Sequence, residues 1–376
     1  MRRSNTYGMK VLLVGVVVAL VAAGEPVRAD FTFGETTNIG APVNTAYDEE
    51  MPSISADGLE LYFQSRRPGG YCLFDLWVAK RESLDDPWGE PANLGPLVNS
   101  GDSNWSHGIS ADGLELYFEA NRPGNYGGVD LWVAVRETID EPWGEPVNLG
   151  PVVNSSVNDA CPNISADGLE LNFRSKRPGG CGEHDLWVSK RPMIDEPWGA
   201  PVNLGSIVNS LDYEGYPSLS ADGLSLFFNS DRFNGARGWD FDIWLTRRKT
   251  KDSAWGEPIN LGPGINTTHF EVAPSISADG HTLYFSDWKS QIRPGGCGGA
   301  DIWQAPIIPI VDFNGDETLD AADIDIMIDC WGTDDSLCDI GPMPWGDGVV
   351  DVEDLIVLVE RIVENRAAIA DTGEVQ

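Results

Sequence analysis

Short runs of alternating apolar and polar residues cover most of the chain, and turns rich in glycine, proline, asparagine and aspartate separate them. In the stretch ISADGLELYF, an Asp-Gly pair lies between two apolar-rich runs, and the second run alternates before it thickens in aromatic residues. Such a pair predicts a β-hairpin in which Gly58 is free to adopt a positive φ. The pattern therefore predicts a mainly β protein.

This hairpin motif occurs five times, starting at positions 54, 109, 164, 219 and 276. The runs DLWVAKR and WGEPVNLG recur in step with it and predict a third strand and a proline-containing outer strand. A fixed period with four strands in each unit indicates a five-bladed β-propeller over residues 30–308. An outer-strand motif precedes the first unit and does not follow the fifth. The N-terminal strand is therefore expected to complete the fifth blade and close the ring.

The fivefold motif resembles the repeat of a known family. PSISADGLELYFQSRRPGG, followed by DLWVAKR, is similar to the WD40-like (PD40) propeller repeat found in TolB-type proteins. The resemblance covers about three quarters of the chain. It implies binding or scaffolding and no reaction. The chain departs from TolB in its blade count and in its C-terminal segment.

The formal charge at pH 7 is −34, and it is concentrated near the C-terminus, where residues 311–376 hold 18 acidic and 2 basic residues. Such an excess of negative charge argues against nucleic acid or anionic lipid as a partner. Calcium-rich surroundings would fit it. The acidic C-terminal segment needs an explanation of its own.

Residues 1–29 have the pattern of a secretory signal peptide. Arg2, Arg3 and Lys10 precede the apolar run VLLVGVVVALVAA, and small residues form two cleavage sites, ending at Ala23 and Ala29. We therefore expect a secreted, periplasmic or cell-surface protein. The alternative is an uncleaved N-terminal anchor.

The segment DFNGDETLDAAD has the spacing of a calcium-binding loop. Asp312, Asn314, Asp316, Asp320 and Asp323 occupy positions 1, 3, 5, 9 and 12, and Thr318 supplies a backbone carbonyl at position 7. Hard oxygen ligands at these offsets wrap a Ca²⁺ ion. Without the ion, the carboxylates would repel one another at close range. Metal binding is therefore expected to drive the folding of this segment.

A second and less regular loop contains GDGVVDVED. Asp347, Val349, Asp351 and Asp354 take positions 5, 7, 9 and 12. Position 1 is filled only if Asp339 reaches in across an insertion. Apolar residues at helical spacing follow each loop, so each loop is expected to lead into a helix.

The two loop and helix units together resemble a type I dockerin over residues 309–365. The resemblance implies Ca²⁺ as cofactor and a cohesin-like or cell-surface protein as partner. The alternative for this segment is a stability or sorting tag. Cys330 and Cys338 are close enough in sequence to form a disulfide between its two halves. Residues 366–376 are expected to be a disordered tail.

One position near the start of each inner strand is polar in all five repeats: Glu49, Asn104, Asp159, Glu214 and Glu271. A ring of these side chains around the channel would bind a ligand or a cation, or supply the paired carboxylates of a glycosidase. The alternative is structural, with each side chain paired to the repeated arginine of its own blade. These arginines are Arg67, Arg122, Arg177, Arg232 and Arg293. Repeat symmetry favours the structural interpretation, because catalysis needs two carboxylates in different environments.

Residues that break the repeat are better candidates for a specific function. Trp105, Trp239 and Trp288 are out of register in loops predicted on one face, where an indole ring can stack on a sugar. Burial under a neighbouring loop is the alternative. Cys161 and Cys181 also break the pattern, on a single blade, and are candidates for a disulfide.

Motifs for the common enzyme classes are missing from the sequence. The four histidines show no metal-ligand spacing, and there is no P-loop, dinucleotide or zinc motif. The sequence therefore favours a binding or scaffold protein over an enzyme, with a carbohydrate or protein ligand at the propeller face. The alternative is a polysaccharide-degrading O-glycosyl hydrolase with acidic residues at the channel mouth.

Overall fold

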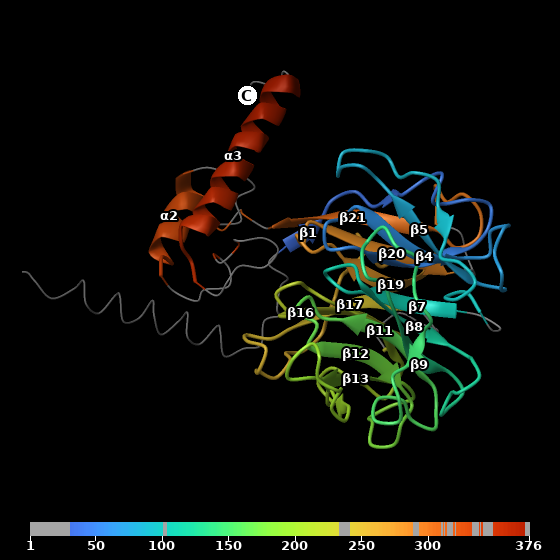
Figure 1. The fold of residues 1–376 in the computed structure, drawn as a ribbon. Helices are drawn as coiled ribbons and strands as arrows, with labels where there is room; N and C mark the ends of the chain where they lie inside the picture. The colour runs from blue at the N-terminus through green and yellow to red at the C-terminus, as the bar shows by residue number, and fades with distance from the viewer. Residues whose placement is uncertain are drawn as a thin grey trace, which may run out of the picture.

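The computed structural model describes residues 31–100, 104–232, 241–288, 293–309 and 349–372, together with 311, 313, 319, 321–332, 338 and 340. Five β-sheets surround a central channel, and two helices follow them (Figure 1). The prediction of a mainly β, five-bladed propeller is confirmed. The expected signal peptide lies outside the described residues, and within them no helix is long and apolar enough to cross a membrane.

Each of the first four blades has three six-residue strands and a two-residue outer strand, all antiparallel from the channel outward. The first blade contains β3 (Glu49–Ile54), β4 (Glu60–Ser65), β5 (Asp75–Lys80) and β6 (Ala92–Asn93). The second contains β7 (Asn104–Ile109), β8 (Glu115–Ala120), β9 (Asp130–Val135) and β10 (Val147–Asn148). The third contains β11 (Asp159–Ile164), β12 (Glu170–Ser175), β13 (Asp185–Lys190) and β14 (Val202–Asn203). The fourth contains β15 (Glu214–Leu219), β16 (Ser225–Ser230), β17 (Asp242–Arg247) and β18 (Ile259–Asn260).

The fifth blade takes its outer strands from the other end of the described chain. It contains β19 (Phe270–Ile276), β20 (Thr282–Trp288) and β21 (Ile302–Pro309). Both β1 (Phe31–Phe33) and β2 (Thr37–Asn38) pair with β21 in antiparallel fashion. The N-terminal strands thus complete the last blade and close the ring, as the order of motifs predicts.

The outer strands are shorter than their sequence motif, because prolines such as Pro87 and Pro91 have no N–H for a ladder. An asparagine side chain replaces the missing ladder bonds. The Asn99 carboxamide accepts a hydrogen bond from the Leu76 N–H (2.7 Å) and donates one to the Leu76 carbonyl (3.0 Å). Equivalent bonds are made by Asn44, Asn154, Asn209 and Asn266.

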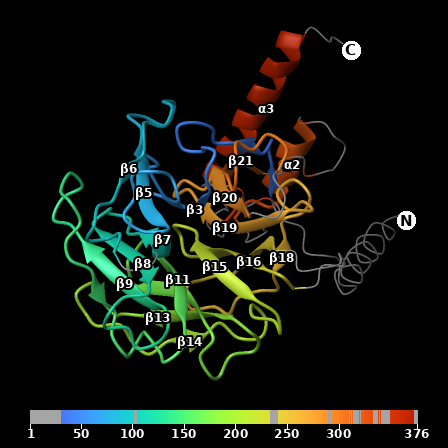
Figure 2. The ribbon, with the colours of Figure 1, turned by 90° about the vertical axis from the view of Figure 1, so that its right-hand side faces the viewer.

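Arginines clamp neighbouring blades together. Arg136 of the second blade donates to Glu60 (3.1 Å) and to the Tyr62 hydroxyl (3.3 Å) of the first. Arg191 and Glu115 repeat this contact between the second and third blades, and Arg248 and Glu170 repeat it between the third and fourth. Figure 2 shows the blades arranged around a common axis.

The C-terminal helices are α2 (Ala321–Asp329) and α3 (Val352–Thr372), which lie where the last propeller strand ends (Figures 1 and 2). Met327 and Leu358 are fully buried in a small core between them. The helix α3 continues through residues 366–372, which were expected to be part of a disordered tail. That expectation is wrong for these residues, because the sequence RAAIA consists mainly of good helix formers.

Candidate functional site

The five ring residues predicted around the channel are buried inside the blades. Glu49, Asn104, Asp159, Glu214 and Glu271 all have 0% exposure. Each bonds to the arginine of its own blade, at N–O distances of 3.2 Å (Arg67), 2.9 Å (Arg122), 2.6 Å (Arg177), 3.0 Å (Arg232) and 3.1 Å (Arg293). This is the structural alternative, and none of the five lines the cavity at the channel mouth.

Each of these arginines also stacks on the aromatic core of its blade. The guanidinium of Arg67 lies 4.9 Å from the Phe63 ring centre and 5.4 Å from that of Trp77. Glu49 accepts further hydrogen bonds from Ser65 and from the backbone of Thr45. A buried ion pair with all its partners in place specifies one arrangement more than it adds net stability. The ring residues therefore hold the start of each inner strand in one arrangement.

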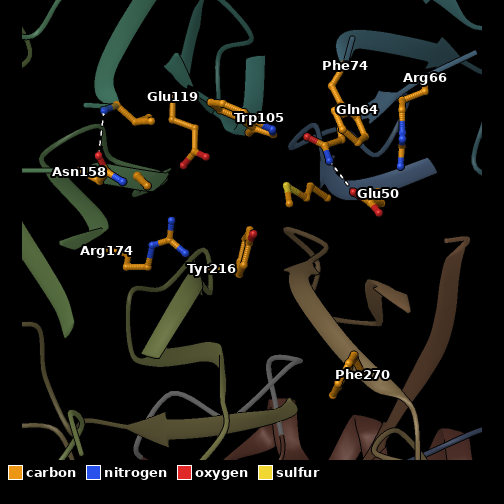
Figure 3. Close-up of a pocket in the computed structure, with 13 residues that line it drawn as sticks. Glu50, Gln64, Arg66, Phe74, Trp105, Glu119, Asn158, Arg174, Tyr216 and Phe270 are labelled. Carbon is orange, nitrogen blue, oxygen red and sulfur yellow. Dashed lines mark hydrogen bonds between the residues drawn. The ribbon is translucent and has the colours of Figure 1, made fainter. Parts of the chain in front are cut away.

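A cavity of about 680 Å³ lies at the channel mouth, and in the first three blades the residue after the ring position lines it: Glu50, Trp105 and Ala160. It is lined by Glu50 and Trp105 on inner strands and by Gln64, Glu119 and Arg174 on the adjacent strands (Figure 3). Successive side chains in a strand point to opposite faces. A ring residue therefore points into the blade, and the residue that follows it points toward the channel. The volume is in the range of about 300 to 1,000 Å³ that is common for small-molecule sites.

Bulges in the inner strands help to shape this cavity. The register with the adjacent strand shifts in all five blades, and four residues at the shift have positive φ: Met51 (58°), Cys161 (55°), Tyr216 (50°) and Ala273 (53°). A bulge redirects side chains, and left-handed backbone is strained for residues other than glycine. The side chains of Met51 and Tyr216 line the cavity as a result.

Two glutamates in this wall are almost fully buried. Glu50 is 3% exposed and accepts a hydrogen bond from the Gln64 amide (2.6 Å), and burial raises its pKa to about 7. Glu119 is 6% exposed and accepts a hydrogen bond from the Cys161 N–H (2.5 Å). Burial also raises the pKa of Glu119, against the attraction of Arg174. The Glu50 carboxyl group is therefore poised to hold a proton near neutral pH.

A smaller lobe of about 240 Å³ adjoins the main cavity and shares Glu50, Met51, Arg174 and Tyr216 with it. The rings of Tyr213 and Phe241 and the side chains of Asn229 and Val272 complete the lobe. Asn229 is 1% exposed, and neither atom of its carboxamide has a hydrogen-bond partner among the described residues. The lobe is apolar apart from these polar groups, which suits a ligand that supplies the missing hydrogen bonds.

The other residues predicted from irregularities in the repeat have different outcomes. Trp105 lines the cavity, Trp239 lies outside the described residues, and Trp288 ends β20 with a side chain that is also outside them. The predicted disulfide between Cys161 and Cys181 is not formed. Cys161 is buried on an inner strand and faces Ser106, whereas Cys181 lies in the loop before β13.

The predicted calcium loops lie mostly outside the described residues: Asp312, Asn314, Asp316, Thr318, Asp320, Asp339 and Asp347. Asp323 and Asp354, both at position 12, have 0% exposure. Asp323 accepts a hydrogen bond from the Phe313 N–H (2.9 Å), and Asp354 accepts one from Ile340 (2.5 Å) and one from Asp351 (2.6 Å). The Sγ atoms of Cys330 and Cys338 are 2.9 Å apart.

Sequence reasoning missed Glu50, Gln64, Glu119, Arg174 and Asn229. The sequence did contain a signal, because these residues occupy two positions of the repeat at which the residue type differs from blade to blade. The inner-strand column reads Glu50, Trp105, Ala160 and Gly215 in the first four blades, and the adjacent column reads Gln64, Glu119, Arg174 and Asn229. Residues that differ between equivalent positions are free to specialise.

No protein-family model matches the chain, and no curated protein matches it. Among solved structures, TolB from Acinetobacter baumannii is 13% identical over 69% of this chain and 54% of its own, with a TM-score of 0.43. A putative TolB from Agrobacterium tumefaciens is 17% identical over 74% and 99%, with a TM-score of 0.42. An alpha-L-arabinofuranosidase from Lactobacillus brevis is 14% identical over 71% and 92%, with a TM-score of 0.49. The chain spans about half the length of the A. baumannii protein, and likeness at this level does not bear on activity.

Proposed function

We propose that this protein is an exported binding protein whose propeller holds a small polyhydroxylated ligand, a saccharide, at the channel mouth. One observation carries the proposal: the side chains that differ between blades gather around a single cavity, and some of their buried polar atoms have no hydrogen-bond partner among the described residues. These atoms are Glu50 Oε1, Gln64 Oε1 and both carboxamide atoms of Asn229. A buried polar group left unpaired costs about 1 to 3 kcal/mol, so a partner that enters the cavity is favoured.

Saccharide chemistry fits these groups. An amide and a protonated carboxyl group both donate and accept hydrogen bonds, and so does a sugar hydroxyl. Trp105 and Tyr216 add aromatic faces to the same wall, and the apolar face of a sugar ring can stack on such a face. The five ring residues contribute nothing to this site, because their hydrogen bonds are made inside the blades.

The C-terminal segment is proposed to be a calcium-binding, dockerin-like module that attaches the protein to a partner at the cell surface. Support comes from two matching contacts. The N–H of Phe313, just after Asp312, bonds to Asp323, and the N–H of Ile340, just after Asp339, bonds to Asp354. In both loops the residue at position 2 is therefore bonded to the carboxylate at position 12. This brings the two ends of each loop together, as binding of a single ion requires.

A second candidate function is hydrolysis of a glycosidic bond in the same cavity. Glu50 and Glu119 are carboxyl groups in different settings, one bonded to a side-chain amide and the other to a backbone N–H beside Arg174. A glycosidase needs two such groups, one of which is protonated near neutral pH. The raised pKa of Glu50, about 7, favours it as the proton donor.

Saccharide binding can be tested with the full-length protein on a glycan array, followed by calorimetry with the bound glycans. Asn229→Leu should weaken binding about tenfold or more, because the ligand loses hydrogen bonds to a buried amide. Asn172→Leu is the matched control, since Asn172 is another buried asparagine (1% exposed) that lines neither lobe.

Two results would contradict the proposal: no glycan binds, or Asn229→Leu binds as tightly as the unaltered protein. The same samples separate the two candidate functions. Release of reducing ends from a bound glycan, lost in Glu50→Gln, would show a hydrolase. Stable binding without release would show a binding protein.

A further inference from the structure

Arg174 is an arginine of the channel mouth that has no ionic partner among the residues the structure describes. It lines both lobes of the cavity and lies over two tyrosine rings, 5.1 Å from the centre of Tyr213 and 5.8 Å from that of Tyr216. Within the described residues its guanidinium makes no hydrogen bond and no ion pair. Arg66, the other arginine of the wall, is paired with Asp48.

Arg177 provides a comparison, because its guanidinium group makes the hydrogen bonds that Arg174 lacks across the described ranges. Arg177 follows on the same blade, and its guanidinium binds Asp159 and the Val153 carbonyl, both at 2.6 Å. A guanidinium offers five N–H donors in a planar fork, which matches the two oxygens of a carboxylate. Arg174 lines the cavity, and Figure 3 shows it beside Tyr216 with no hydrogen bond to the other residues drawn.

The surrounding carboxyl groups do not cancel this positive charge. Glu119 attracts Arg174 electrostatically, but it forms no ion pair with it and instead accepts the Cys161 N–H. Burial raises the pKa of Glu50 to about 7, which reduces its negative charge near neutral pH, and burial also raises the pKa of Glu119. The channel mouth therefore suits an anionic ligand group, although the formal charge of the whole chain is −34.

We infer that the ligand is an acidic saccharide, a uronate, whose carboxylate pairs with Arg174 while its hydroxyl groups bind the amides of the wall. This inference rests on the proposed function and adds the chemical class of the ligand. Arg174 lies where the two lobes meet, so a carboxylate there leaves the sugar ring within reach of both Asn229 and the Trp105 side of the cavity.

A uronate satisfies the wall better than other carboxylates. Asn229, Gln64 and Glu50 hold unpaired atoms that would each remain buried and unsatisfied around a simple fatty or aromatic acid. The C-terminus of a peptide also supplies a carboxylate, but it lacks a hydroxyl-bearing ring that can stack on Trp105. Peptide binding is accordingly an outcome that would count against the inference.

The test is calorimetry at pH 7 with the full-length protein, using a galacturonate trimer and the neutral galactose trimer as probes. The unaltered protein should bind the acidic trimer at least tenfold more tightly than the neutral one. Arg174→Gln should remove that preference, so that the acidic and neutral trimers bind within about threefold of each other. Arg174→Lys should keep part of the preference, because an ammonium retains the charge and loses the fork.

Lys176→Gln is the matched control, since it removes the same charge from an exposed side chain of the same blade. It should leave the preference unchanged, and the thermal midpoint of each variant reports whether it is folded. Tighter binding of the neutral trimer, or an acidic preference that survives Arg174→Gln, overturns the inference and leaves the proposed function intact. If neither trimer nor any other saccharide binds, both fail. Binding of a peptide carboxylate in place of both trimers would also overturn it.

Discussion

Glu49 and Glu50 are neighbours in β3 and have opposite environments. Glu49 is fully buried in its blade and pairs with Arg67. Glu50 faces the channel, and one of its carboxyl oxygens has no hydrogen-bond partner in the described part of the chain. The same alternation separates Asn104 from Trp105 in the second blade. At the scale of single residues, the first position of the pair holds the blade together, and the second is available for binding.

The burial of Glu50 should appear as a dependence of stability on pH. Its pKa is raised from 4.5 to about 7 in the folded protein, so the folded state holds a proton that the unfolded state has released. The contribution of Glu50 to the free energy of unfolding is fully present below pH 4.5 and is lost as the pH rises through about 7. Glu50→Gln removes this penalty and should stabilise the protein at pH 8 by up to about 3 kcal/mol, with little effect at pH 5.

Urea unfolding of both proteins at the two pH values measures the difference. Gln64, Arg66, Asp48 and Asp287 all act on Glu50, so the difference between the two proteins includes their interactions with its charge. The exposed Glu82→Gln serves as the control and should behave alike at both pH values. The prediction is refuted if the difference in the free energy of unfolding between the unaltered protein and Glu50→Gln is the same at pH 5 and pH 8.

At the scale of elements, the repeat predicts the strands well and the cavity poorly. The Asp-Gly turn, the third strand and the closing N-terminal strand follow from local patterns, and Gly58 has the expected positive φ of 70°. Alternation shows that Glu49 and Glu50 face opposite sides, but it does not show which side is the channel. The bulges add a further shift, and the residues at them, such as Met51 and Cys161, share no type that would mark a bulge.

The two C-terminal loops show a similar limit. Position 12 could be predicted from spacing, because Asp323 and Asp354 each lie at the start of a helix. The start of the second loop could not, since four extra residues separate Asp339 from the rest of the pattern. The bond from Ile340 to Asp354 supports Asp339 as that start. Tertiary contacts supply what residue counting leaves open.

Removing calcium should loosen this segment and leave the propeller intact. Limited proteolysis with a chelator is expected to cut the chain after about residue 310, because acidic ligands without an ion repel one another. Asp323→Asn should give the same cleavage even with calcium present. Asp325→Asn, an exposed position in the same helix, is the control and should stay protected. A digestion pattern that is the same with and without chelator would rule out the calcium proposal.

At the scale of the whole molecule, the five blade interfaces are not equivalent. Three are clamped by an arginine and a glutamate, and between the first and fifth blades the charge of Arg81 acts on Tyr284. Between the fourth and fifth blades, the corresponding positions hold Ser225 and Ile307. Ile307 packs with Phe31 and Phe227 in an apolar core, so the N-terminal strand supplies part of the contact there.

This interface should be the one through which the ring opens. Phe31 is 5% exposed, and it packs between the last two blades from a strand of three residues. Phe31→Ala should lower the free energy of unfolding by about 3 kcal/mol, because it removes a large buried ring from the contact that closes the propeller. Val147→Ala, on the outer strand β10 and 62% exposed, is the control and should change stability by less than about 0.5 kcal/mol.

Hydrogen exchange locates the effect. In Phe31→Ala the amides of β21 and β1 should exchange faster than those of β8 and β12, whose interfaces keep their clamps. A uniform increase over all five blades would mean that the ring unfolds as one unit with no preferred opening. Since the channel-mouth cavity is formed by the first four blades and Phe270 of the fifth, a ring that opens at the fifth blade leaves most of the cavity wall in place. Ligand binding should therefore be weakened less in Phe31→Ala than in Asn229→Leu.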